Sequence, residues 1–163
     1  MKKNIININN IEWTQSDHGD FSHERKSLTQ AVTCEKLGAS IYRLAPGKKA
    51  FPYHYHYANE ETVFILEGSG TMRLNNAVIA IKKDDYIAMP TGTEHAHQII
   101  NTSEKPLIFL CFSTMIHPDV TEYPDSKKIG VTTGSAPGSD PKNYSLKVFL
   151  KKSDAVDYFL DEK

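Results

Sequence analysis

The chain has 163 residues, the size of one ordinary domain, with 19 basic and 20 acidic residues and a formal net charge of −1. This balance does not favour nucleic acid or an anionic membrane as a partner. No apolar run approaches the roughly 18 residues of a membrane-spanning helix, and residues 1–10 lack the apolar stretch of a signal peptide. We therefore expect one domain, residues 1–163, located in the cytoplasm.

Short apolar runs separated by turn residues follow one another through most of the chain, a pattern typical of an all-β protein. Asn75-Asn76 suits a two-residue hairpin, because Asn tolerates a positive φ better than other non-glycine residues. Strands at this spacing predict a sandwich or a barrel. The expected strands cover residues 21–28, 35–45, 51–57, 62–67, 71–74, 78–81, 86–89, 97–101 and 107–113.

After residue 113 the chain changes character. Residues 115–125 suit a segment that returns across the barrel, and the Gly-, Ser- and Pro-rich residues 134–141 suit a loop. That loop is either a plain surface loop or a lid. Residues 153–160 are predicted to form a short C-terminal helix capped by Ser153.

The stretch from His54 to Glu61 holds the chemistry of this sequence. His54 and His56 lie two residues apart, so on a strand both imidazoles point to the same face. Glu61 follows across a short turn and can return to that face on the next strand. Two imidazoles and a carboxylate form the start of a transition-metal site, whereas the alternative is surface decoration of a Tyr- and His-rich strand.

Residues 46–70 resemble the first motif of the cupin family. In that motif a glycine is followed by His-x-His, a Glu after three or four residues, and a Gly after six more. Six residues separate Glu61 from Gly68, whereas the same count from Glu60 reaches Glu67. The spacing therefore selects Glu61 over Glu60 as the ligand.

A second stretch is similar to the other cupin motif, with two departures. Asp84 occupies a glycine position, and Asp can adopt the left-handed conformation at some cost. Counting forward from Pro90-x-Gly92 places the motif's histidine at His95, whereas counting back from Asn101 places it at His97. We favour His97 and keep His95 as the alternative. His95 would otherwise be a supporting group, a proton shuttle or a solvated side chain.

The resemblance implies an all-β cupin fold, a double-stranded β-helix or jelly-roll barrel, with extra N-terminal strands and a motif core of about residues 45–113. It also implies one divalent transition metal per chain (Fe, Mn, Ni or Zn), with His54, His56, Glu61 and His97 as ligands. The expected function is a small-molecule enzyme of the oxygenase, isomerase or decarboxylase type. A non-catalytic binding or sensing protein and a vestigial site are the alternatives.

Two further observations bear on ligands and partners. Sugar-phosphate isomerisation normally needs basic residues near the metal. The basic residues within the motifs are Lys48, Lys49 and Arg73, and nothing in the sequence shows that they point inward, which makes that reaction a weak candidate.

Several strands are apolar on both faces, so N-terminal strands or a second subunit must cover the outside. We expect a homodimer whose interface covers an outward row of aromatic residues and two neighbouring apolar residues. The row is Phe51, Tyr53, Tyr55 and Tyr57, and the neighbours are Phe64 and Leu66.

Overall fold

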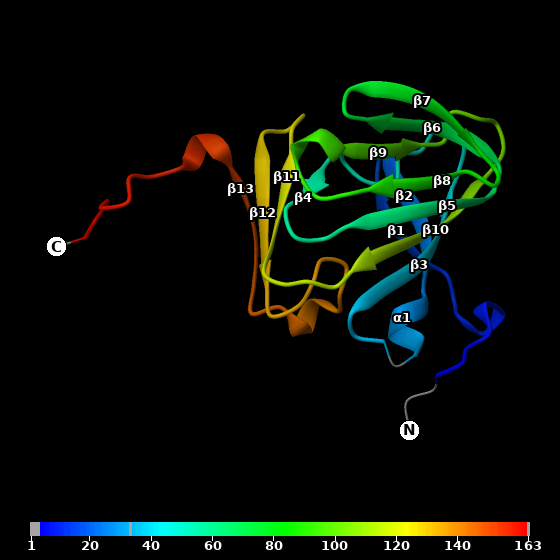
Figure 1. Cartoon of the computed structure of the whole chain (residues 1–163), viewed down its shortest axis with the longest axis horizontal. Helices are drawn as coiled ribbons and strands as arrows, with labels where there is room; N and C mark the ends of the chain where they lie inside the picture. The colour runs from blue at the N-terminus through cyan, green and yellow to red at the C-terminus, as the bar shows by residue number, and fades with distance from the viewer. Residues whose placement is uncertain (1–3, 33, 163) are drawn as a thin grey trace.

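The computed structural model describes residues 4–32 and 34–162, whose regular secondary structure is mostly β-strand (Figure 1), and the all-β prediction is confirmed. One short α-helix, α1 (Leu28–Ala31), and the 3₁₀ helices η1 (Ile8–Asn10), η2 (Thr93–His95), η3 (Pro141–Asn143) and η4 (Lys152–Asp154) interrupt the strands. The strands are β1 (Thr14–His18), β2 (Phe21–Ser27), β3 (Leu37–Leu44), β4 (Tyr55–His56), β5 (Glu61–Glu67), β6 (Ser69–Leu74), β7 (Ala77–Lys82), β8 (Tyr86–Met89), β9 (His97–Ile100), β10 (Leu107–Thr114), β11 (Asp119–Tyr123), β12 (Lys128–Thr133) and β13 (Leu146–Lys151).

The strands form a six-stranded sheet and two smaller sheets. The six-stranded sheet has the order β1-β2-β3-β10-β5-β8, and all its neighbours are antiparallel. The smaller sheets, β13-β12-β11-β4 and β7-β6-β9, are joined where the backbone of His54 pairs with that of His97. The junction of the two smaller sheets therefore lies at two of the predicted metal ligands.

The core lies between these sheets. Tyr42, Leu44, Ile65 and Phe109 come from the six-stranded sheet and pack in one buried cluster with Met72 of β6. Side-chain alternation along β5 explains the arrangement, because Val63 and Ile65 are almost fully buried while the residues between them are only partly buried. Burial of each such aliphatic side chain stabilises the folded state by roughly 1.5–3 kcal/mol.

Two turns have the backbone conformations that the sequence predicts, and a third turn requires a glycine. Asn75 and Asn76 have φ values of 42° and 63° and connect β6 to β7 in a two-residue hairpin. Asp84, at the motif's glycine position, adopts a φ of 74°. Gly68 has a φ of 84°, and a Cβ there would lie 2.4 Å from the Pro106 carbonyl oxygen, so a side chain would be strained and would clash.

The strand expected over residues 51–57 is only two residues long. Phe51 packs against the main core instead of sharing a face with Tyr55, because the backbone before β4 does not run as a regular strand. Tyr53 and Tyr55 are 4% and 3% exposed within one chain, and only Tyr57 is open, at 53%. The predicted outward aromatic row does not exist as an exposed face, so it cannot be the reason for a dimer.

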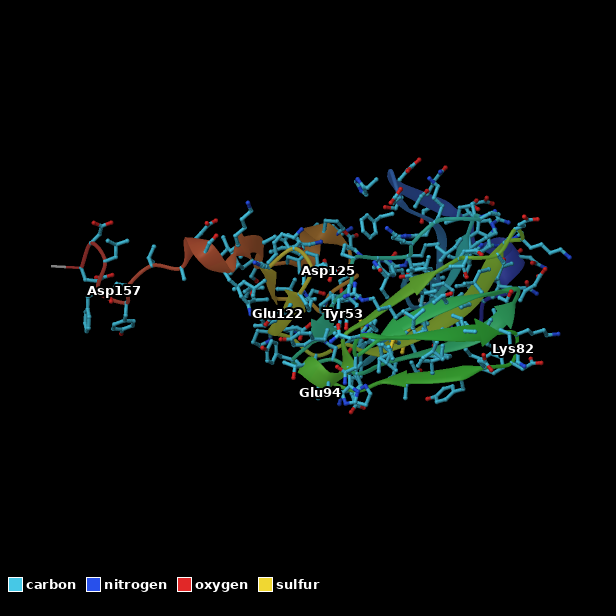
Figure 2. The ribbon with its side chains drawn as sticks, turned by 90° about the horizontal axis from the view of Figure 1, so that it is seen from above. Tyr53, Lys82, Glu94, Glu122, Asp125 and Asp157 are labelled. Carbon is cyan, nitrogen blue, oxygen red and sulfur yellow. The ribbon has the colours of Figure 1, made fainter. Side chains whose placement is uncertain are left out.

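The C-terminal third contains three strands that the sequence did not predict. β11 occupies the expected return segment and pairs with β4, and β12 and β13 extend that sheet. The helix expected over residues 153–160 is reduced to η4, after which the chain continues as an arm that leaves the body, with Asp157 well away from the sheets (Figure 2). No described helix has the length and hydropathy to cross a membrane.

Candidate metal centre

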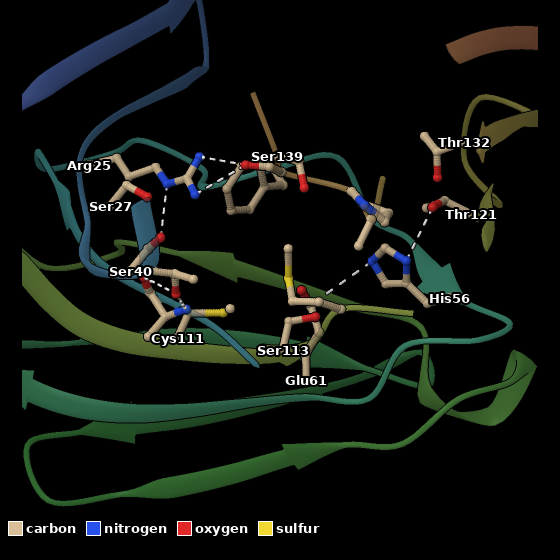
Figure 3. A pocket seen from close by; sticks show the side chains of 18 of the residues that line it. Arg25, Ser27, Ser40, His56, Glu61, Cys111, Ser113, Thr121, Thr132 and Ser139 are labelled. Atoms are coloured by element: carbon tan, nitrogen blue, oxygen red, sulfur yellow. Dashed lines mark hydrogen bonds and ion pairs between the residues drawn. The ribbon is translucent and has the colours of Figure 1, made fainter. Parts of the chain in front are cut away.

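His54, His56 and Glu61 converge on one point. The candidate ligand atoms of these three side chains all lie within 4.8 Å of one another. β4 ends at His56, and β5 begins at Glu61, so the short turn between them brings the carboxylate back to the imidazoles. All three side chains line a cavity of about 720 Å³, and Figure 3 shows His56 and Glu61 turned toward each other across it.

His97, rather than His95, lies beside this group. Its Nε2 atom is 3.1 Å from Glu61 Oε2, and its ring centroid is 4.5 Å from that of His54. His95 lies in η2, and its side chain does not line the cavity. His97 thus lies beside the three converging residues, its role as the fourth ligand stays a prediction, and the two extra residues lie in the turn that contains η2.

Each imidazole is oriented through its Nδ1 atom. His54 Nδ1–H donates to the Pro52 carbonyl over 2.7 Å, and His97 Nδ1–H donates to the His95 carbonyl over 2.9 Å. With the Nδ1 atoms acting as donors, the Nε2 atoms keep their lone pairs for the common centre. His95 therefore contacts this group of residues through its backbone oxygen.

The third imidazole has a buried carboxylate behind it. His56 Nδ1–H donates to Asp119 Oδ2 over 2.6 Å, and the other Asp119 oxygen accepts the Ala58 backbone N–H. The Asp119 side chain is fully buried. Sequence reasoning missed this residue because no motif spacing includes it. The only available signal was that it lies in the predicted return segment.

The pKa values of these groups depend on burial and on their neighbours. Burial, together with the nearby His97 and His56, lowers the pKa of His54 to about 3, so its imidazole is neutral. Burial favours the neutral form of Glu61, but the close contact with His97 and the electrostatic influence of the three imidazoles outweigh burial and hold the Glu61 pKa at about 2. The cluster therefore contains an ionised carboxylate.

These residues fit a divalent transition metal. Neutral imidazole nitrogens and a carboxylate are the ligands that such ions prefer. Two ligands 2.0–2.2 Å from one ion lie at most about 4.4 Å apart, and the Glu61–His97 and Glu61–His56 separations of 3.1 and 4.0 Å already satisfy this limit. Small side-chain rotations would bring the remaining donors into range.

Aromatic side chains form the wall next to the centre. The Tyr123 ring stacks on His54 with centroids 5.8 Å apart, and Phe51 meets the same imidazole edge-on at 6.3 Å. Burial, followed by the charges of Asp119 and Glu61, raises the pKa of Tyr123 to about 12. The phenol therefore stays protonated at neutral pH and can donate a hydrogen bond into the cavity.

The basic residues of the motifs face away from the centre. Arg73 forms an ion pair with Asp125, Lys49 pairs with Asp20, and Lys48 donates to a backbone carbonyl. Two basic residues outside the motifs, Arg25 and Lys147, do line the cavity. Sequence reasoning missed both, because it searched for cations only within the motifs.

Comparison with known proteins finds a family match over part of the chain. Residues 40–113 match the family model described as "Cupin domain". Over 60 residues the chain is 45% identical to the uncharacterized protein MJ1618 of Methanocaldococcus jannaschii, a match that spans 37% of this chain and 46% of that protein. The chain therefore spans less than half of that relative.

Two solved structures share the fold over nearly the whole chain. One is from Acidithiobacillus ferrooxidans and is provisionally named a sugar phosphate isomerase; it has a TM-score of 0.79 and 24% identity, and the match covers 92% of this chain and 91% of that one. The other, a sugar phosphate isomerase from a cupin superfamily of Silicibacter pomeroyi, has a TM-score of 0.75 and 22% identity, with 93% and 94% covered. At this identity they establish the fold alone, and the jelly-roll prediction is confirmed.

The roles of His97 and His95 can be separated by mutation. His97→Ala removes a side chain that contacts Glu61, so metal content per chain should fall to a small fraction of that of the wild type. His95→Ala keeps the backbone carbonyl that orients His97 and should retain nearly full content. Elemental analysis of protein purified without chelators measures both. Full occupancy in His97→Ala together with loss in His95→Ala would reverse the assignment.

Asp119 offers a second prediction. Asp119→Asn preserves the shape of the side chain but removes the charge that orients His56, so metal affinity should fall by about 10–100-fold. Competition with a chromogenic chelator measures the affinity. Asp125→Asn is the matched control, since it neutralises a partly exposed carboxylate that pairs with Arg73. Equal affinities in the two variants would show that Asp119 has no influence on the centre.

Proposed function

We propose that this chain, whose residues 40–113 match the cupin model, is an enzyme that uses one divalent metal ion per chain to act on a small organic molecule. His54, His56, Glu61 and His97 would hold the ion. The observation that carries the proposal is the convergence of three imidazoles and one ionised carboxylate on a cavity of about 720 Å³. A vestigial site would have no need to keep four donors together with the buried acceptors behind them.

The donor set limits which metal ions can bind and which reactions they can support. Fe(II), Mn(II) and Ni(II) suit three imidazoles and a carboxylate with two positions left open, and Zn(II) suits the same donors with four or five ligands. Such an ion, when bound, supplies Lewis acidity and open coordination positions. The reaction is therefore of the oxygenase, isomerase or decarboxylase type.

Side chains around the centre would bind and orient the substrate. The protonated Tyr123 phenol can donate a hydrogen bond to a substrate oxygen near His54. Phe51, Tyr42 and Phe109 form an apolar wall that excludes water from one side of the cavity. Exclusion of water strengthens the electrostatic interactions inside the site.

The alternative is a protein that binds or senses a small molecule without turnover. The same metal and the same cavity would serve that role. The discriminating observation is whether a bound molecule leaves the metal-loaded protein chemically unchanged.

The test begins with metal analysis of protein purified without chelators. We expect about one divalent ion per wild-type chain and a small fraction of that in Glu61→Ala. Oxygen uptake and product formation are then followed with a panel of hydroxy acids, dicarboxylates and sugar phosphates. Turnover that Glu61→Ala abolishes supports the enzyme. Binding of panel members without turnover would favour the alternative, and a wild-type chain that takes up no metal would overturn the proposal.

We also propose that residues 1–163 form one cupin domain and that two copies pair as a homodimer. The support for pairing comes from the C-terminal region and not from the aromatic row. β13 is an outer strand of its sheet and exposes Phe149 and Leu150, each about half. The arm that follows exposes Tyr158 by 86% and Phe159 by 70%. An apolar arm and an unpaired strand edge on the same chain can cover each other across a two-fold axis.

Light scattering at micromolar concentration tests the dimer. The full chain should show about twice its mass of 18.3 kDa. A variant ending at Asp154 should show the single mass, because it lacks the exposed arm. Tyr86→Asp is the control, since this residue is 66% exposed on β8, away from the C-terminal sheet, and should leave the mass unchanged. A full chain of single mass would refute the dimer.

A further inference from the structure

β2 places a second polar group in the cavity, away from the metal centre. His23, Arg25 and Ser27 alternate along β2, so their side chains share one face. Arg25 pairs across the sheet with Tyr42, and Ser27 pairs with Ser40 of β3. All five line the same cavity as Glu61 and His56. Figure 3 shows Arg25, Ser27 and Ser40 on one side of the cavity and His56 on the other, with Glu61 between.

The charge of Arg25 is not neutralised by a carboxylate. Within residues 4–32 and 34–162, no carboxylate lies within 4.0 Å of its guanidinium, whereas Arg43 and Arg73 each form a two-point ion pair. Arg25 Nε–H donates to Ser40 Oγ over 2.9 Å, and both terminal nitrogens donate to the Gly138 carbonyl over 3.3 Å. A guanidinium has five N–H donors, so two remain for a ligand.

Ser27 supplies a second observation that points to a ligand. Its Oγ atom is buried and has no hydrogen-bond partner among the described residues. A buried hydroxyl without a partner is costly, and such groups commonly mark a position that a ligand or water occupies. Ser27 is two residues from Arg25 on the same strand face, so one bound group can accept from both.

We propose that Arg25 and Ser27, with Ser40 positioning the guanidinium, bind an oxyanion group of the small molecule, a phosphate or a carboxylate. An oxyanion accepts charge-assisted hydrogen bonds from a guanidinium fork and would also satisfy the free hydroxyl. This inference rests on the proposed function in one respect only: it assumes that the same molecule reaches the metal centre.

The strand order sets the length of that molecule. β2 and β5 are separated by β3 and β10, which makes three inter-strand steps. At about 4.8 Å per step, the backbones of Arg25 and Glu61 lie on strands about 14 Å apart. Both side chains reach inward from the sheet, so a chain of a few carbon atoms can join an oxyanion at Arg25 to an oxygen at the metal centre.

The other polar groups at this part of the cavity leave the site cationic. Lys147 lines the cavity with its ammonium 4.9 Å from the Tyr144 ring centroid. Asp140 also lines it, but its carboxylate is paired with Lys142 over 3.0 Å. Glu35 lies on the lining as well, and it forms no ion pair with Arg25 within the part of the chain that the structure describes.

A purely structural role is the alternative for Arg25. Its bond to the Gly138 carbonyl tethers the loop of residues 134–141, and this tether alone would explain the side chain's position. The two roles differ in what they predict for Ser27, because its Oγ atom contacts no polar group of the loop.

The test uses calorimetric titration of the full, Mn(II)-loaded chain with three probes of similar size: glycerol 3-phosphate, glycerate and glycerol. We expect at least one of the two anions to bind and neutral glycerol to bind far more weakly, and the stronger anion identifies phosphate or carboxylate as the group. Arg25→Met should raise the dissociation constant of that anion by about 100-fold, and Ser27→Ala should raise it by about tenfold. Arg43→Met is the control, because it removes an equivalent charge that faces away from the cavity.

The result that would overturn the inference is anion binding that Arg25→Met and Ser27→Ala leave unchanged, or a wild-type chain that binds neither anion. If Arg25→Met lowers the melting temperature, Ser27→Ala decides alone, since it should weaken the anion without a change in melting. Metal content is measured in every variant and should stay at the wild-type value. Arg25-dependent anion binding without turnover of any panel member would favour the non-catalytic alternative and keep this site, whereas turnover that does not depend on Arg25 would keep the enzyme and overturn this site.

Discussion

The ionised carboxylate of Glu61 is the constraint around which this site is built. Its side chain is only 19% exposed, and a carboxylate removed from water is costly unless charges or hydrogen bonds compensate it. A cation held jointly with the three neighbouring imidazoles would compensate it, and those imidazoles can share a cation only if their Nε2 lone pairs face the carboxylate. Their orientation is therefore as important as their presence.

That orientation depends on groups from three separate parts of the chain. Two imidazoles donate to the backbone carbonyls of Pro52 and His95, which lie two residues before the histidines that they orient. The third donates to Asp119, 63 residues further along the chain. Because β11 pairs with β4, the sheet itself brings Asp119 behind His56. Two of the three imidazoles are thus oriented by nearby backbone, and the third by the pairing of distant strands.

This difference explains how much of the site the sequence could predict. The spacing of His54, His56, Glu61 and Gly68 reflects one turn and two short strands, so counting residues was enough to bring the ligands together. The choice of His97 over His95 also followed from local spacing, measured from Asn101. Asp119 could not be found in the same way, because its place depends on a pairing between strands far apart in sequence.

The errors in the fold have the same origin. A regular strand over residues 51–57 would place Phe51 and Tyr55 on one face, but the backbone before Tyr55 is irregular, and Phe51 turns into the core. β12 pairs with β11, and β13 pairs with β12, so both strands depend on pairing along the sheet that no local pattern reveals. Sequence patterns predict strands well where one face is buried in the core. They predict strands poorly where strand formation depends on pairing with a neighbouring strand at the edge of a sheet.

The division between motif and flanking residues has a consequence for specificity. The predicted metal donors lie within residues 40–113, the segment that matches the family model, whereas Arg25, Ser27 and the loop around Gly138 lie outside it. β2 joins the six-stranded sheet next to β3, and this position alone turns its polar face into the cavity. A change in β2 or in the loop can therefore alter which molecule fits without disturbing the donors. The motifs would position the metal, while the flanking strands determine the shape and charge of the rest of the cavity. Chains that share the same four donors can therefore differ in substrate.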